Sequence, residues 1–294
     1  MSRRAEAGAA PRLVPLGATL MLAALLSACA GPSPEPAPSR AQQQAVVSSE
    51  RAGRQLARGD LPAARQGYRL ALASAQAVQD PALEAAALLN LTLVHARMGD
   101  LAAAHGAVDQ ILEAPARFDA AVQARAAARK ALLRLDEGAD DEALRWADVA
   151  TARCPEPCTL APALDTLRGQ VAFSRGDLAG TMALARRAAE AAAAAAQPAE
   201  QAGALRLLAR AQTRLGETGP AADALARAWA IDHPLGQPDR LALNLVYAAD
   251  NEDRRGNAAQ AADLYQRALT VYNATGDVRN AEALRQRLAN RPTR

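Results

Sequence analysis

The sequence has few aromatic residues, few cysteines and almost no lysine. Its 294 residues include two Trp, four Tyr and two Phe, and Lys130 is the only lysine. So few rings leave little material for a platform on which nucleic acid bases stack, or for a large aromatic ligand pocket. The formal net charge is +3, and loss of residues 1–28, which carry three Arg and one Glu, would lower it to +1. A nearly neutral chain with interspersed signs lacks the electrostatic footprint of a DNA or RNA binder.

Motifs for catalysis or cofactor binding are also missing. The three histidines, His95, His105 and His233, are far apart and have no metal-ligand spacing. The sequence has no nucleophile–base constellation, paired-carboxylate motif, phosphate loop or metal signature. We therefore expect no enzyme activity, no cofactor, no metal site and no small-molecule substrate.

Alanine, in contrast, makes up roughly a quarter of the chain, and with Leu, Arg and Glu it gives a helix-forming composition. This composition excludes an all-β fold and predicts an all-α one.

The first 28 residues have the layout of a bacterial export signal. Arginines at positions 3, 4 and 12 precede an apolar stretch over 13–26 that is too short to span a bilayer comfortably. The stretch ends in Leu26-Ser27-Ala28-Cys29. This tetrapeptide resembles the lipobox of bacterial lipoproteins, and the resemblance implies cleavage before Cys29 and acylation of that cysteine. A plain secretory signal or a poorly made transmembrane helix are the alternatives.

The resemblance also implies a location. Two or three acyl chains would anchor the protein stably to a membrane. Ala30 follows the cysteine, where enterobacterial lipoproteins retained in the inner membrane carry Asp. We therefore expect an outer-membrane lipoprotein that faces the periplasm. Residues 29–44 read as a tether, because alternating prolines over 31–39 favour an extended polyproline II conformation.

A repeat of about 40 residues runs through the rest of the chain. A turn glycine recurs at spacings of 40, 39, 38, 40 and 40, and an alanine or threonine follows it at +5 and, in most repeats, an alanine at +12. The glycines are Gly59, Gly99, Gly138, Gly176, Gly216 and Gly256. Gly can end one helix in a left-handed conformation, and small residues seven apart lie on one face of the next helix, where two helices cross closely.

These residues resemble the tetratricopeptide repeat, whose signature positions include a Gly-Asp turn and two such alanines. The best matches are 255–269 and 87–101, and the departures include Thr181 in place of one signature alanine. The resemblance implies a right-handed α-solenoid of six helix-turn-helix repeats over residues 45–290. A last segment, which starts at Gly276, reads as a capping helix.

Cys154 and Cys158 flank a Pro-Glu-Pro loop between the third and fourth repeats. In an oxidising envelope, two such neighbours favour a structural disulfide. Free thiols, a redox motif or half of a zinc site are the alternatives.

Function in such solenoids comes from the concave face, which the first helix of each repeat lines. Arg206, Arg210 and Arg214 are spaced i, i+4, i+8 and are expected to form a basic stripe on one helix. Guanidinium groups can bind carboxylates bidentately. Counted back from the turn glycines, the candidate peptide-binding residues are Asn90, Arg97, Arg125, Arg129, Gln170, Arg206, Arg210, Arg214, Tyr247 and Arg254. Within the tetratricopeptide family, the resemblance implies that Asn90 contacts peptide backbone.

The sequence therefore predicts a lipid-anchored periplasmic scaffold or adaptor that binds envelope proteins or peptides in its groove. Solvated helix faces without a partner, a passive spacer, and a ligand-binding or enzymatic lipoprotein are the alternatives.

Overall fold

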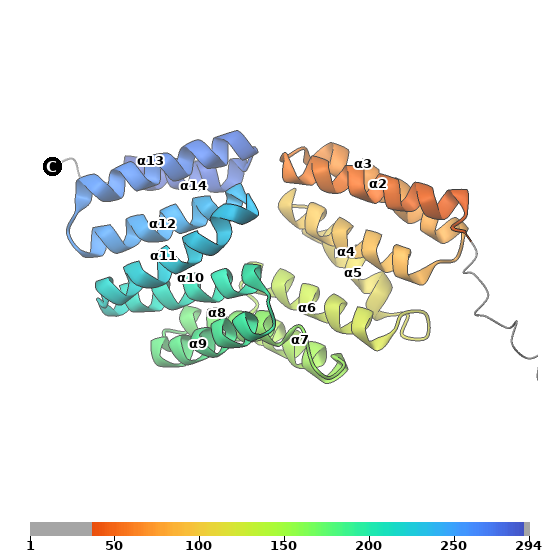
Figure 1. The fold of residues 1–294 in the computed structure, drawn as a ribbon, viewed down its shortest axis with the longest axis horizontal. Coiled ribbons are helices and arrows are strands. Elements are labelled where there is room, and N and C mark those ends of the chain that lie inside the picture. The colour runs from red at the N-terminus through yellow and green to blue at the C-terminus, as the bar shows by residue number, and fades with distance from the viewer. Residues whose placement is uncertain (1–36, 291–294) are drawn as a thin grey trace, which may run out of the picture. The chain divides into compact units, whose positions relative to one another are not determined.

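The structure, a computed structural model, describes residues 37–290, and within them it contains thirteen α-helices and no strand. The export signal, Cys29 and most of the tether lie outside the described residues. The helices form one compact unit that starts at Arg40 (Figure 1). The predicted all-α class is confirmed.

The helices follow one another as six pairs and a single last helix. The pairs are α2 (Arg40–Ala57) with α3 (Leu61–Ala77), α4 (Pro81–Arg97) with α5 (Leu101–Leu112), α6 (Ala120–Asp136) with α7 (Asp140–Arg153), α8 (Ala161–Ser174) with α9 (Leu178–Ala194), α10 (Pro198–Leu215) with α11 (Thr218–Leu235), and α12 (Pro238–Arg254) with α13 (Ala258–Thr275). The last helix, α14 (Val278–Ala289), packs on α13. The six repeats and the capping helix are therefore present as expected.

Each pair turns at its predicted glycine. All six turn glycines have positive φ, between 75° and 87°, which is the left-handed conformation that a side chain disfavours. Three of the second helices then begin with an aspartate cap: Asp60, Asp100 and Asp177 each accept a hydrogen bond from a backbone N–H three residues ahead. In these three repeats, two adjacent residues, the glycine and the aspartate, therefore determine the turn and the start of the second helix.

The small residues after each turn form the crossing between the two helices of a pair. At +5 the side chains are fully buried: Ala64, Ala104, Ala143, Thr181, Ala221 and Ala261. At +12, where the second repeat has the larger Ile111 in place of alanine, the side chains are at most 2% exposed: Ala71, Ile111, Ala150, Ala188, Ala228 and Ala268. Thr181 fits because its hydroxyl donates to the backbone oxygen of Asp177, one turn earlier.

Adjacent repeats pack in two ways. Each second helix packs on the first helix of the next repeat, and the first helices from α2 to α12 lie side by side. The first helices therefore share one face of the solenoid, which is the face that was expected to carry function.

The N-terminal boundary differs from the prediction. Helix α2 already begins at Arg40, so residues 40–44, which the sequence assigned to the tether, are helical. The segment 40–44 holds no proline and has three glutamines, so nothing in it stops the helix from extending. Across residues 37–290, no helix is long and apolar enough to span a bilayer.

Candidate functional site

A hollow of about 480 Å³ opens on the first helices of the last three repeats. Its lining residues come from α8, α10 and α12: Phe173, Arg210, Thr213, Arg214, Asp250, Asp253 and Arg254. Arg210 and Arg214 lie one turn apart on α10, and Asp250 and Arg254 lie one turn apart on α12, so each pair projects from one face of its helix. Three repeats therefore contribute to one polar surface, and the Phe173 ring forms its aromatic part.

Aromatic rings stack on two of the three arginines of this hollow, Arg210 and Arg214. The guanidinium carbon of Arg210 lies 4.4 Å from the ring centre of Phe173 and 5.0 Å from that of Tyr247. That of Arg214 lies 5.3 Å from Phe173. Stacking fixes a guanidinium plane while leaving its N–H donors for other partners. Among the described residues, no carboxylate forms an ion pair with Arg210, Arg214 or Arg254.

The two carboxylates of the hollow, Asp250 and Asp253, in contrast, both accept hydrogen bonds from the Tyr265 hydroxyl. Asp250 accepts a hydrogen bond of 2.5 Å from the Tyr265 hydroxyl and forms an ion pair of 2.5 Å with Arg287 of the capping helix. The Arg287 guanidinium also lies over the Tyr265 ring. Burial, and next the bond to Asp250, raise the pKa of Tyr265, so its hydroxyl stays a donor. The charge that the hollow offers to a ligand is thus mainly that of its arginines.

The prediction was wrong for Arg206. Its side chain is buried, and its Nη1 atom donates to Oδ2 of Asp232, a fully buried carboxylate on α11. Burial lowers the pKa of Arg206, and Asp232 opposes that shift. An i, i+4, i+8 row drifts by roughly 80° around a helix of 3.6 residues per turn, so its first member can face a different neighbour from its last. The basic stripe therefore has two members in the hollow, not three.

Two candidate arginines of the second and third repeats, Arg97 and Arg129, lie near carboxylates of the fifth and sixth. Arg97 pairs with Asp239 at the start of α12, at 3.2 Å. Arg129 is half-buried; burial lowers its pKa, while Glu200 at the start of α10 raises it and Arg97 lowers it further. These groups place α4 and α6 opposite α10 and α12 across the face of the first helices. The two arginines are partly neutralised, so they add less to a basic groove than the sequence suggested.

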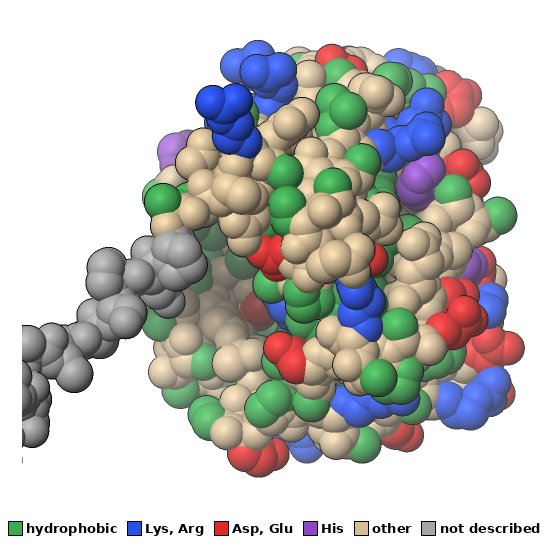
Figure 2. Space-filling model, turned by 90° about the vertical axis from the view of Figure 1, so that its right-hand side faces the viewer, with side chains coloured by type: hydrophobic (Ala, Val, Ile, Leu, Met, Phe, Trp, Pro, Cys, Tyr) green, Lys and Arg blue, Asp and Glu red, His purple; other side chains and the backbone are tan. Residues whose placement is uncertain are grey.

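The other candidates lie on the expected helices but outside the hollow. Asn90 and Gln170 are half-buried on α4 and α8, and Arg125 is exposed on α6. The sequence missed Asp253, Tyr265 and Arg287, because their convergence depends on how α12, α13 and α14 pack. Figure 2 shows the side of the helical unit that lies to the right in Figure 1. Acidic and basic side chains are interspersed over this side, and its surface is hollowed.

Cys154, Cys158 and the three histidines lie outside the arginine hollow. Cys154 and Cys158 form a disulfide in the loop between α7 and α8, with their Cα atoms 5.4 Å apart. Nδ1 of His95 lies 3.6 Å from Asp100, His105 contacts Glu137 at 2.9 Å, and the His233 ring lies beside Trp229. Over residues 37–290, no three His, Cys, Asp or Glu side chains gather as metal ligands.

Solved structures share this fold at low sequence identity. A Rap protein complexed with competence and sporulation factor has a TM-score of 0.60 and 15% identity, with coverage of 84% of this chain and 76% of that one. Aspartyl phosphate phosphatase F from Bacillus subtilis has a TM-score of 0.59 and 13% identity, with coverage of 85% and 70%. PilW, a widely conserved type IV pilus biogenesis factor, has a TM-score of 0.51 and 17% identity, with coverage of 80% and 97%.

The chain matches no protein-family model and no curated protein. The helix pairs and these structural neighbours together show a tetratricopeptide-like solenoid fold.

Proposed function

We propose that this protein is a lipid-anchored scaffold or adaptor of a bacterial envelope, which binds a carboxylate-bearing peptide segment of a partner protein on its first helices. One observation carries the proposal: Arg210, Arg214 and Arg254 surround one hollow, without carboxylate partners among the described residues. Guanidinium groups without a carboxylate partner are suited to bidentate binding of Asp, Glu or a chain terminus, and two of the three, Arg210 and Arg214, are also held by stacking on Phe173. In this proposal the protein acts by binding and not by catalysis.

Two further observations support the binding role. The hollow spans three repeats, so an extended segment can cross α8, α10 and α12 in turn. A similar solenoid, the Rap protein, is known in a complex with competence and sporulation factor. The anchoring part of the proposal is supported by the resemblance of Leu26-Ser27-Ala28-Cys29 to a lipobox. In this proposal the solenoid lies on the periplasmic side of the outer membrane.

The binding proposal is tested by reversing two charges of the hollow. We expect Arg210→Glu with Arg214→Glu to weaken binding of a labelled hexaglutamate peptide by roughly tenfold or more, because at least one charge-assisted contact is lost and replaced by repulsion. Fluorescence anisotropy at low ionic strength measures the change. In cells, a photo-crosslinker at Thr213 should capture a partner from the envelope, and the double variant should lose that capture.

The matched control reverses two exposed arginines on second helices, Arg186→Glu with Arg227→Glu, which changes the net charge equally. This control should bind hexaglutamate nearly as well as the unchanged protein. Equal binding by the Arg210/Arg214 variant would contradict a ligand-binding hollow and favour a passive spacer.

The anchor is tested by Cys29→Ser in the full chain. Without the thiol no acyl chain can be attached, so the protein should move from the membrane fraction to the soluble periplasmic fraction and lose metabolic labelling by palmitate. A variant that stays in the membrane fraction would show that something other than acylation of Cys29 holds it there.

A further inference from the structure

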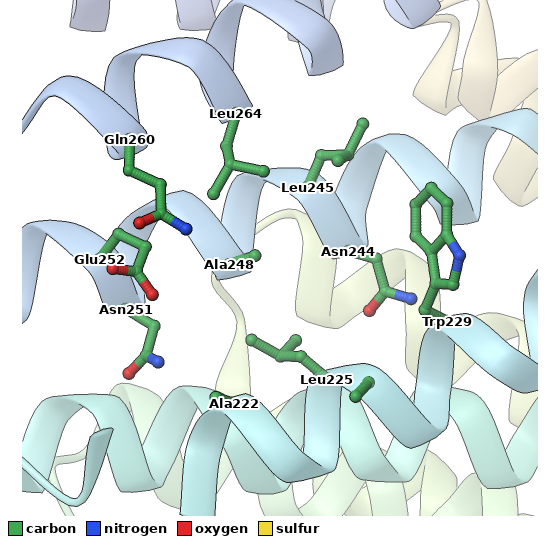
Figure 3. A pocket seen from close by; sticks show the side chains of 11 residues that line it. Ala222, Leu225, Trp229, Asn244, Leu245, Ala248, Asn251, Glu252, Gln260 and Leu264 are labelled. Atoms are coloured by element: carbon green, nitrogen blue, oxygen red, sulfur yellow. The ribbon is translucent and has the colours of Figure 1, made fainter. Parts of the chain in front are cut away.

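A second hollow, of about 250 Å³, lies between α11, α12 and α13. Leu225, Leu245, Ala248 and Leu264 form its middle, with Trp229 and Asn244 toward one end and Asn251, Glu252 and Gln260 toward the other (Figure 3). Helix α12 lines both hollows, but with different faces, since Asp250 and Arg254 belong to the first hollow and Asn244 and Ala248 to the second. The second hollow is therefore separate from the arginine site.

Asn244 is the unusual residue of this hollow. Its side chain is 2% exposed and points from α12 toward α11, between Leu225 and Trp229 (Figure 3). Neither its amide nitrogen nor its amide oxygen has a hydrogen-bond partner, and among the described residues it alone has both side-chain polar atoms in this state. A buried amide without partners costs folding free energy. The fold alone therefore gives no reason for an amide at this position.

The same position in the other repeats is apolar. Twelve residues before the turn glycine, the second to fifth repeats carry Ala87, Ala126, Leu164 and Ala204, all at most 2% exposed. Ala126, Leu164 and Ala204 each belong to a hydrophobic cluster that includes the second helix of the preceding repeat, and such side chains need no hydrogen-bond partner. An alanine at 244 would therefore satisfy the packing of the sixth repeat as it does that of the others.

Asn251, two turns further along α12, provides the contrast. It is equally buried, but its amide oxygen accepts from the Thr213 hydroxyl at 3.1 Å and its amide nitrogen donates to the Thr218 backbone oxygen at 2.9 Å. Glu252 is likewise engaged, by Arg255 and Asn257. Asn251 and Glu252 are thus satisfied by the protein, and Gln260 at the same end is exposed to solvent. Asn244 is therefore the buried group left for a ligand.

We infer that this hollow binds one leucine-like residue of a partner's peptide segment, whose backbone amide pairs with Asn244. A side-chain amide can accept from a peptide N–H and donate to a peptide C=O at the same time, and such a pair satisfies both of its buried atoms. The hollow is smaller than the usual pocket of a drug-sized ligand, so it suits a single aliphatic side chain with its peptide group. This site is additional to the arginine hollow and needs no charge on the peptide.

Fluorescence of Trp229 reports on the site when Trp146, the other tryptophan, is changed to Phe in every variant. We expect the uncharged peptide acetyl-Ala-Ala-Leu-Ala-Ala-amide to change this fluorescence saturably, and the peptide with Ala in place of Leu to bind roughly tenfold more weakly or worse. Asn244→Ala should reduce binding of the leucine peptide to a similar extent. Arg210→Glu with Arg214→Glu should leave it unchanged, which separates this site from the proposed function.

Thermal unfolding of the same variants supplies the second readout. Asn244→Ala should keep or raise the midpoint, whereas the control Asn251→Ala should lower it by roughly 4 °C or more, because it breaks two bonds between repeats. The inference is overturned if the leucine peptide causes no saturable change, if Asn244→Ala binds it as well as the unchanged protein, or if Asn244→Ala destabilises the fold as much as Asn251→Ala.

Discussion

At the residue scale, single aspartates decide where several helices of the solenoid begin. The first N–H groups of a helix have no partner inside it, and a side-chain oxygen just before the helix can accept from them. Asp80 does this at the start of α4, where it accepts from the backbone N–H groups of Ala82 and Leu83, each at 3.1 Å. It also accepts from Gln42 of α2 at 3.3 Å, so the same carboxylate joins two repeats.

Asp80→Ala should therefore lower the free energy of unfolding by about 1 kcal/mol near neutral pH, which urea unfolding can measure. The bond from the Leu83 N–H, and next those from Gln42 and Ala82, lower the pKa of Asp80 from its ordinary value of 3.8. A carboxylate with a lowered pKa stabilises the fold above its unfolded pKa and loses this contribution as pH falls through the folded value. The difference between the two proteins should thus be full above about pH 5 and shrink below pH 3.8.

A control for this prediction is Asp223→Ala, which removes an exposed carboxylate that caps no helix. It should change stability by less than about 0.5 kcal/mol at either pH. A difference between the unchanged protein and Asp80→Ala that does not vary with pH would contradict the assigned role of the charge.

The sequence alone predicts the structural roles of some residues but not of others. The alanines at +5 and +12 were predictable because each depends only on its own helix pair and each recurs in five of the six repeats. Arg206 was not, because its burial depends on Asp232, a residue 26 positions later whose side chain reaches it only through the packing of α11 on α10. Asn244 likewise looks ordinary until the structure shows its missing partners.

At the scale of elements, the turn glycines explain why the six pairs could be predicted with their order. Each turn glycine ends one helix, and the small residues at the contact between the two helices belong to the same pair. The spacing of these residues along the sequence is therefore enough to predict the pairs. The rotation of each helix about its axis is set by neighbours, and this limits prediction of the site. The sequence placed Arg210, Arg214, Tyr247 and Arg254 correctly on first helices, but it could not show that only the last three repeats form the arginine hollow.

At the scale of the whole helical unit, the first and last repeats meet. An added Cβ at Gly59, in the turn between α2 and α3, would lie 2.0 Å from the backbone oxygen of Thr275 at the end of α13. Figure 1 shows these ends of the two repeats next to each other. The pair of Arg97 with Asp239 also links the second repeat to the sixth. Local repeat spacing does not determine the superhelical path, so this contact could not be predicted from the sequence.

Gly59→Ala, compared with Gly99→Ala, tests this contact, because both glycines have φ of 77° and therefore cost a similar strain when replaced. No atom lies within 4 Å of a Cβ added at Gly99. We expect Gly99→Ala to cost about 1–2 kcal/mol from backbone strain alone. Gly59→Ala should cost more, or should separate the first and last repeats, since a carbon cannot lie 2.0 Å from a backbone oxygen.

Urea unfolding measures the loss in free energy of unfolding of each variant, and small-angle scattering measures its radius of gyration. Separation of the repeats should enlarge the radius of gyration in Gly59→Ala but not in Gly99→Ala, and it should speed amide exchange in the last turn of α13, which loses its contact with Gly59. Equal stability, radius and exchange in the two variants would mean that the first and sixth repeats are not in contact in solution. The face formed by the first helices would then be open on the side between the first and sixth repeats. A peptide could enter from that side rather than along the solenoid axis.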